Sequence, residues 1–268
     1  MTNPAEILPG VIFYSYLSAE RKDKVCFWNH HTLVLMVSGQ LHLETAGQRM
    51  EVKAGEMMLV GKNQLGTLTK TPLPGQSYES IVICLQEDLL RKIALEEQIG
   101  ASPKYVGPSN VPIPPDPFLV GYFQSIIPYA RAIAGPLTED MGMLKVKEGV
   151  KLLLHSLPQL KSYLFDFAEP HKIDLERFMM TNFHFNVPIE RFARLTGRSL
   201  AGFKRDFTKT FGVPPRQWLL DKRLNAAKHL IEQKHQKPSA IYLDLGFESL
   251  PHFSRSFKQK FGKAPSMI

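Results

Sequence analysis

The 268-residue sequence predicts an α+β protein of two domains: an N-terminal antiparallel β-barrel with helices after it, and an all-α C-terminal domain with two helix-turn-helix units. Three observations predict this fold. Short apolar runs separated by turn signals fill residues 10–85, and helical spacing follows at 118–133 and 138–165. After residue 188, one helical pattern then occurs twice.

The barrel is predicted from closely spaced short strands. Residues 32–45 contain two apolar runs that meet at Ser38-Gly39, and EMMLV at 56–60 and SIVICL at 80–85 are further runs. Glycines between the runs mark turns, because glycine adopts the positive φ that tight turns need. This spacing is typical of an antiparallel barrel or sandwich, and we predict the barrel.

The middle of the chain connects the two domains. A helix is predicted at 87–100, and the stretch 106–117 with its five prolines is predicted to be a linker or an extended wrap. The helices after it carry an apolar stripe, which packs either against its own domain or against a second subunit. The predicted domains are a barrel at 1–105, a Pro-rich linker with helices for dimerisation at 106–169, and a helical domain at 170–268.

Positive charge is concentrated in the last third of the chain. Residues 171–268 hold 18 Lys and Arg against 8 Asp and Glu, whereas residues 1–170 carry a net charge of −2. A positive field on one domain is typical of a polyanion-binding protein, with solubility as the alternative interpretation. The sequence shows no secretory signal, no apolar run of ~20 residues and only two cysteines, so we expect a cytoplasmic protein.

The C-terminal repeat joins FKRDFTKTFGVPP at 203–215 to FSRSFKQKFGKAP at 253–265. Three phenylalanines, one glycine and one proline recur in register, and the phenylalanines fall on one face of a helix. Each copy follows a short helix, a glycine and a serine suited to cap the next helix. This order predicts two helix-turn-helix units, at 188–211 and 239–261.

The second helix of each unit has a small-and-basic outer face. Of the eight positions that face away from the Phe stripes, none is acidic and four are basic. Arginine donates to both acceptors of guanine in the major groove, so this face fits a DNA reader better than a scaffold. The predicted DNA contacts are Ser199, Ala201, Lys204, Arg205, Thr208, Lys209, Ser249, Pro251, His252, Ser254, Arg255 and Lys258.

A long helix predicted at 215–233 joins the two units. Apolar residues along it are expected to pack against both: Trp218, Leu220, Leu224, Ala227, Leu230 and Ile231. If this helix sets the two second helices about one DNA turn apart, ~34 Å, both enter successive major grooves on one face of the duplex.

Residues 175–266 resemble the DNA-binding domain of the AraC/XylS family of bacterial transcription regulators. The resemblance is carried by turn, stripe and joining-helix residues: Phe192, Ala193, Leu195, Gly197, Phe203, Lys204, Arg205, Asp206, Phe207, Phe211, Gly212, Val213, Pro215, Trp218, Arg223, Leu224, Ala227, Leu230, Ile231, Gly246, Phe247, Ser249, His252, Phe253, Ser254, Arg255, Phe257, Lys258, Phe261, Gly262 and Pro265. It implies two helix-turn-helix units on one long helix, double-stranded DNA as the partner, and contact with RNA polymerase.

The N-terminal domain is similar, through fewer residues, to the cupin-like sensor of the same family. His31, Val37-Ser38-Gly39 and Lys53-Ala54-Gly55-Glu56 carry the similarity. It implies a small-molecule effector inside the barrel and a homodimer that pairs through 118–165. We expect Trp28, His31 and Leu35 near the effector, because they flank or lie in the first strong strand.

Two residues depart from the family pattern. Tyr242 stands where a small residue is usual, and Pro251 lies in the first turn of the second reading helix, where it cannot donate a hydrogen bond. The chain also stops without the basic tail often found in the family. These departures concern the details of base recognition.

No residue set predicts an enzyme, a cofactor or a metal site. His30, His31 and His42 suggest a metal cupin, but the spacing differs from catalytic cupins, and Glu44 comes too late. Cys26 and Cys84 are expected to be buried small hydrophobes, with a redox-sensing thiol as the alternative. We therefore predict a DNA-binding transcription regulator controlled by a small-molecule effector. The alternatives are a cupin enzyme with an accessory nucleic-acid domain, and a regulator without effector whose barrel only pairs subunits.

Overall fold

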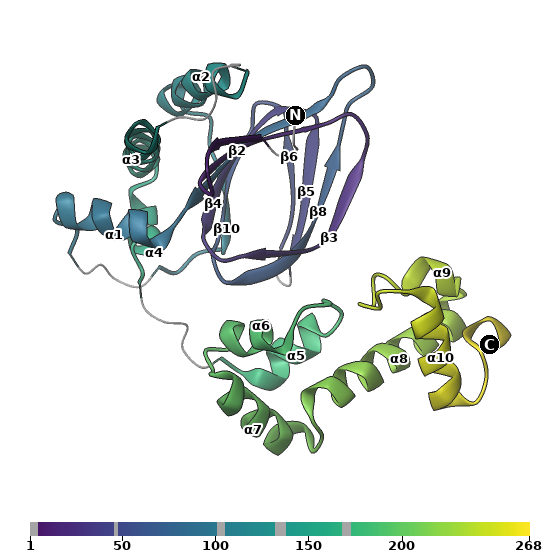
Figure 1. The fold of residues 1–268 in the computed structure, drawn as a ribbon. Helices are drawn as coiled ribbons and strands as arrows, with labels where there is room; N and C mark the ends of the chain where they lie inside the picture. Colours follow the sequence, from purple (N-terminus) through teal and green to yellow (C-terminus); the bar gives the residue numbers. More distant parts are fainter. Residues whose placement is uncertain (1–4, 46–47, 101–104, 132–137, 168–172) are drawn as a thin grey trace. The chain divides into compact units, whose positions relative to one another are not determined.

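A computed structural model describes residues 5–45, 48–100, 105–131, 138–167 and 173–268. It divides the chain into two units, residues 1–167 and residues 168–268 (Figure 1). The first unit contains two β-sheets with helices, and the second is helical, so the predicted α+β class is confirmed. No helix in these ranges is long and apolar enough to cross a membrane.

The strands of the first unit form two antiparallel sheets rather than the predicted closed barrel. The six-stranded sheet runs in the order β1 (Ala5–Leu8), β2 (Ile12–Leu17), β9 (Tyr78–Leu85), β4 (His31–Ser38), β7 (Met57–Val60) and β10 (Asn110–Ile113). The four-stranded sheet runs in the order β3 (Arg21–Trp28), β8 (Gln64–Thr71), β5 (Gln40–Thr45) and β6 (Arg49–Lys53). Pro112 explains one open edge, because proline lacks the N–H that would bond a further strand.

The six-stranded sheet is covered on both faces. Val34 and Met36 of β4 pack toward the other sheet, whereas Leu33 and Leu35 pack toward the helices. Side chains alternate along a strand, so a strand buried on both faces is apolar throughout. This explains the continuous apolar run in β4.

Helices cover the outer face of the six-stranded sheet (Figure 1). They are α1 (Glu87–Glu96), α2 (Pro117–Arg131), α3 (Glu139–Ser156), a 3-10 turn (Pro158–Leu160) and α4 (Lys161–Leu164). α1 ends before the predicted stop at Gly100, because Gln98 adopts the positive φ of 49° that ends the chain's helical path.

The Pro-rich stretch is part of the first unit, so of its two interpretations the linker is wrong and the extended wrap holds. Its β10 pairs with β7, and the side chain of Asn110 is fully buried. That side chain accepts from Gly61 N at 3.3 Å and from Gln64 Nε2 at 2.6 Å, and donates to Thr45 Oγ1 at 3.4 Å. Asn110 thus ties the edge of one sheet to strands of the other.

The second unit consists of helices on both sides of one long helix. They are α5 (Leu175–Asn182), α6 (Ile189–Leu195), α7 (Leu200–Phe211), α8 (Pro215–Lys234), α9 (Pro238–Ile241), α10 (Leu250–Phe261) and a 3-10 turn (Pro265–Met267). α5 was not predicted. Its N-cap is Asp174, whose carboxylate accepts from Arg177 N at 3.0 Å.

Candidate nucleic-acid interface

The first helix-turn-helix unit is formed by α6 and α7. Gly197 takes a φ of 65° in the turn between the two helices. Ser199 then caps α7, because its hydroxyl accepts from Gly202 N at 3.1 Å. Gly212 ends the helix in the left-handed conformation, with a φ of 74°. All three residues take the local roles that the sequence predicts.

The second helix-turn-helix motif, formed by α9 and α10, repeats this geometry. Gly246 takes a φ of 82°, the Ser249 hydroxyl accepts from His252 N at 3.4 Å, and Gly262 ends α10 with a φ of 78°. Like α7, α10 has twelve residues. α9 is shorter than predicted: it stops before Tyr242, whose bulky ring packs against the core of the unit.

Phenylalanine rings hold both second helices against their cores. Phe203 and Phe207 of α7 are fully buried with their ring centroids 5.4 Å apart, and Phe253 and Phe257 of α10 lie 5.7 Å apart. Trp218 of α8 packs 4.7 Å from the ring of Phe211. Since one face of each helix is fixed in this way, the opposite face is left to solvent.

The outer faces of α7 and α10 carry the twelve predicted DNA contacts. None of these side chains is buried: Ser249 and Ser254 are half-buried, and the other ten are exposed. Five of the twelve are exposed and positively charged: Lys204, Arg205 and Lys209 on α7, and Arg255 and Lys258 on α10. Both helices therefore offer basic surface to a ligand, and the contacts themselves stay predictions.

Asp206 forms ion pairs with two arginines that differ in exposure. Arg198 is 11% exposed, lies 3.2 Å from Asp206 Oδ2 and donates to Thr196 O at 2.8 Å, so it is fixed in the turn. Arg205 is 77% exposed and lies 3.4 Å from Asp206 Oδ1. An exposed ion pair contributes little free energy, so Arg205 can exchange Asp206 for a DNA acceptor at small cost.

Arg223 on α8 joins the two halves of the C-terminal domain. Its guanidinium donates to Phe183 O at 2.8 Å and Phe185 O at 3.0 Å, both in the segment between α5 and α6, and to Gly246 O at 3.1 Å in the turn before α10. Burial lowers the pKa of Arg223 to about 10, which leaves it charged at neutral pH. In the sequence Arg223 only helped to carry the family resemblance. Its bridging role was missed because a single buried arginine has no periodic signal.

One residue of the joining helix does not lie where the sequence predicts. Leu220 is 37% exposed, and the neighbouring Leu219 is buried instead. Leu220 shares a helix face with Arg216 and Arg223, and this face borders a groove of about 730 Å³ that lies within the C-terminal domain, between its two helix-turn-helix motifs. The other predicted contacts of α8 lie in or against the helical core.

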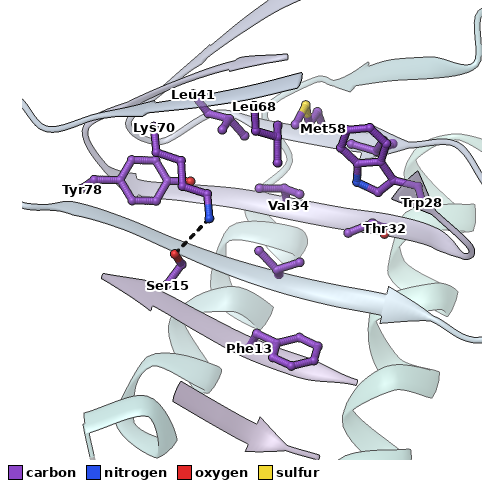
Figure 2. Close-up of a pocket in the computed structure, with 12 residues that line it drawn as sticks. Phe13, Ser15, Trp28, Thr32, Val34, Leu41, Met58, Leu68, Lys70 and Tyr78 are labelled. Atoms are coloured by element: carbon purple, nitrogen blue, oxygen red, sulfur yellow. Dashed lines mark hydrogen bonds between the residues drawn. The ribbon is translucent and has the colours of Figure 1, made fainter. Parts of the chain in front are cut away.

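The N-terminal unit contains a cavity of about 260 Å³ between its two sheets, which we call the intersheet cavity (Figure 2). Trp28 lines it, together with Thr32 and Val34 of β4. His31 and Leu35 do not, because alternation along β4 turns them toward the helices. The expectation that these two residues lie inside the barrel is therefore wrong, by one position along the strand.

His31 predicts a pH effect on stability. It is 1% exposed, and its ring lies 4.5 Å from that of Tyr163. Burial, reinforced by Lys62, lowers its pKa from 6.5 to about 3. Between pH 6.5 and pH 3, His31 is protonated in the unfolded chain but stays neutral in the folded chain. Lowering the pH in this range therefore destabilises the fold. From pH 7.5 to pH 5, the free energy of unfolding of wild type should fall by about 2 kcal/mol more than that of His31→Leu.

Trp28 fluorescence during urea unfolding, in a Trp218→Phe background, reports this unit. His42→Leu removes an exposed imidazole from β5 and is the matched control. Equal pH slopes in wild type and His31→Leu would contradict the assignment.

Other reactive side chains of the first unit do not converge. Among the described residues, no group of three His, Cys, Asp or Glu is arranged to hold a metal ion. His31 and His42 lie in different sheets. Burial raises the pKa of the half-buried Cys84, and a protonated thiol is a poor nucleophile. This favours the small hydrophobe over the redox sensor for Cys84.

Known proteins match both halves of the chain. Residues 31–167 match the ExsA N-terminal regulatory domain, and residues 192–268 match a helix-turn-helix domain. The thermoregulatory protein LcrF of Yersinia pestis is 25% identical over 257 residues, which cover 91% of this chain and 90% of LcrF. The HTH-type transcriptional regulator ExsA of Pseudomonas aeruginosa is 24% identical over 259 residues, which cover 90% of each chain. Apo ToxT from Vibrio cholerae is similar with a TM-score of 0.48 at 13% identity, covering 98% of both chains.

Proposed function

This chain belongs to the AraC/XylS family of DNA-binding transcription regulators, in the branch with an ExsA N-terminal regulatory domain, and from this premise we propose that α7 and α10 read a specific sequence in duplex DNA. The repeated geometry of the two helices carries the proposal. Each is capped by a serine, buries a Phe face and exposes a small-and-basic face. One helix in each of two successive major grooves suits this arrangement.

We assign different roles to arginine and lysine on these faces. The planar guanidinium of Arg205 or Arg255 donates two parallel hydrogen bonds, which match the O6 and N7 acceptors of guanine. The ammonium of Lys209 is a point charge near the end of α7 and suits a phosphate.

Arg205→Ala and Arg255→Ala should each relax the preference at one base position, at a cost of about 1–3 kcal/mol in binding to the preferred site. Lys209→Ala should weaken binding to all sequences about equally, because a phosphate contact carries no sequence information. Selection from random duplexes gives the site, and titration of single-base variants of that site gives each preference.

Lys234→Ala, at the exposed end of α8, is the matched control and should change neither quantity. An Arg205→Ala variant with unchanged base preference would remove Arg205 from the readers. If Arg255→Ala were also unchanged, α7 and α10 would lose their assignment.

We further propose that a small molecule in the intersheet cavity controls DNA binding. Side chains from seven strands of both sheets line this cavity, and most of them are apolar. A concave, mainly apolar site with a few polar groups is the usual form of a small-molecule site. Linkage requires that DNA change the affinity for the effector by the same factor as the effector changes the affinity for DNA.

Pairing of two chains through 118–165 is also part of the proposal. Phe118 on α2 and Leu144 on α3 are 62% and 67% exposed, and Met141 adds to the apolar surface. Exposed large apolar side chains on adjacent helices fit a subunit interface. Sedimentation should therefore give a dimer for the full-length protein and a monomer for residues 170–268.

Leu144→Glu should shift the full-length protein toward monomer, because pairing would bury the new charge. Leu95→Glu on α1, at a leucine that is 82% exposed, is the matched control. A full-length protein that is monomeric at micromolar concentration would remove the pairing role of 118–165.

A regulator of this kind acts where the chromosome is transcribed. The proposal therefore includes a cytoplasmic location and contact with RNA polymerase next to the bound site. Polymerase recruitment on a promoter that carries the selected site, measured with purified components, tests this contact. The proposed function assigns no catalytic activity, metal or cofactor to the chain.

A further inference from the structure

Asp206 is the single acidic residue in the sequences of α7 and α10. Its side chain is 27% exposed, and each of its carboxylate oxygens faces one arginine. Oδ2 lies 3.2 Å from Arg198 Nε, and Oδ1 lies 3.4 Å from Nη2 of Arg205, a proposed base reader. A negative charge therefore lies beside a reader, on a surface that is otherwise suited to a polyanion.

Arg198 fixes the position of this carboxylate. It is 11% exposed, and its Nη1 atom donates to Ile173 O at 3.0 Å and to Thr196 O at 2.8 Å. An ion pair between two exposed side chains contributes little, because both must lose freedom when they pair. Here Asp206 is already held by a nearly buried partner, so Arg205 alone loses freedom when it pairs with Oδ1.

The second copy of the repeat lacks this arrangement. Fifty residues later, Ser256 takes the place of Asp206, and Glu248 takes the place of Arg198. A serine cannot form an ion pair with the neighbouring Arg255. Since α10 nevertheless has the same length, the same kind of serine cap and the same buried Phe pair as α7, the helix-turn-helix fold does not require the carboxylate. Asp206 therefore calls for a role other than folding.

An arginine on a DNA-binding surface can contact a phosphate as well as a base. Phosphates occur along every duplex, and contacts to them carry no sequence information. Asp206 opposes such a contact in two ways: its charge repels a phosphate, and its oxygen competes for Nη2 of Arg205. Guanine offers an arginine two acceptors in parallel and can replace one long ion pair, whereas no other base presents this pair of acceptors.

We infer that Asp206 is a positioning residue that sets the base specificity of α7, because it keeps Arg205 from phosphates and releases it to guanine. This inference rests on the proposed reading role of Arg205. It adds a residue that lies outside the predicted DNA contacts and acts through one of them. Where the guanine is absent, Arg205 stays with Asp206 and gains no replacement contact, so the wrong base is penalised in full.

Anisotropy titration of the full-length protein on two duplexes tests the inference. One duplex carries the selected site, and the other replaces the guanine at the position that Arg205→Ala relaxes. Asp206→Asn keeps the shape of the side chain and removes its charge. The loss of affinity caused by the replaced guanine should shrink about five-fold, the upper range for one exposed ion pair. The salt slope on the replaced duplex should exceed that on the site by about 1, because Arg205 then contacts one phosphate more.

Asp221→Asn is the matched control, because its carboxylate pairs with Lys260 at 2.6 Å, and Lys260 is not a predicted DNA contact. It should leave the loss of affinity and the difference in slope as in wild type. Asp206→Ser introduces the residue of the second copy and should act like Asp206→Asn, and thermal melts report whether each variant is folded. In an Arg205→Ala background, Asp206→Asn should not change the ratio of the two affinities.

Each remaining outcome has a definite meaning. An Asp206→Asn variant with the wild-type loss of affinity and equal slopes would overturn the inference and leave Arg205 as a reader. An equal effect in the Arg205→Ala background would overturn it too, because the charge would then act without Arg205. Weaker binding to both duplexes by the same factor would indicate a structural role and overturn it as well. If Arg205→Ala relaxes no base position, the proposed reading role itself fails, and this inference fails with it.

Discussion

The affinity of the full-length protein for its DNA site is expected to fall by at least about 10³-fold between 50 and 200 mM salt, the loss that roughly six phosphate contacts produce. Each Lys or Arg that neutralises a phosphate releases condensed counterions, so added salt opposes binding. The second unit has the charge for this, with 18 Lys and Arg in residues 171–268. Fluorescence anisotropy of a labelled duplex over a salt series measures the slope.

The fragment 170–268 should keep most of this affinity and the same slope, because residues 1–170 carry a net charge of −2 and offer no basic excess to the phosphates. Lys204→Gln with Lys209→Gln should reduce the slope by about 2, since each phosphate contact contributes about 1. Lys53→Gln, in the first unit, is the matched control. A fragment that ignores duplex DNA at low salt would contradict the location of the site.

The helix-turn-helix units were predictable because their signals are local. Ser199 caps α7 through an atom only three residues away, and Gly212 ends the same helix through its own backbone conformation. The Phe stripe needs only the helical period to identify a buried face. The same signals recur fifty residues later, which supports the interpretation of both copies. The outer face of each helix is then the face opposite the buried Phe stripe.

The first unit was less predictable because its features depend on distant pairings. Individual strands followed from apolar runs and turns, but whether two sheets close into a barrel depends on which edges meet, and local residues do not encode this. The edge strand β10 is an example. Pro112 and the prolines on either side of the strand indicate an irregular segment, and only pairing with β7 makes it a strand.

His31 and Leu35, which were expected near an effector, face away from the intersheet cavity, and the sequence did not show this for a related reason. A strand with one buried face alternates between apolar and polar residues, which identifies the inward face. β4 is buried on both faces, so His31, Thr32, Val34 and Leu35 showed no alternation. Lys70 also lines the intersheet cavity and was not predicted to do so, because a lysine in a strand usually faces solvent and its place is set by the pairing of β8 with both β3 and β5.

Arg223→Ala is expected to lower the free energy of unfolding of the second unit by about 3–5 kcal/mol, because three carbonyl groups lose a charged donor. Arg223→Lys keeps the charge but lacks the planar guanidinium that reaches carbonyl groups in both halves of the C-terminal domain. Its loss of unfolding free energy should therefore be intermediate. Lys234→Ala, exposed on the same helix, is the control. Urea unfolding followed by Trp218 fluorescence in a Trp28→Phe background measures these changes.

The same variants should reveal whether Arg223 sets the distance between α7 and α10. If it does, Arg223→Lys should bind the full site about 100-fold more weakly, about 2.7 kcal/mol, while its affinity for a duplex with only one half of the site stays near that of wild type. Loss of the bridge should also relax spacing, so that one added base pair between the halves costs the variant less than it costs wild type. A purely structural role predicts the opposite: weaker binding in proportion to the unfolded fraction, equal for half and full sites, and an unchanged spacing preference. The two roles are separated by measuring the affinity for both duplexes at a temperature where the variant is fully folded. Only simultaneous binding by the two helix-turn-helix motifs depends on the distance between α7 and α10.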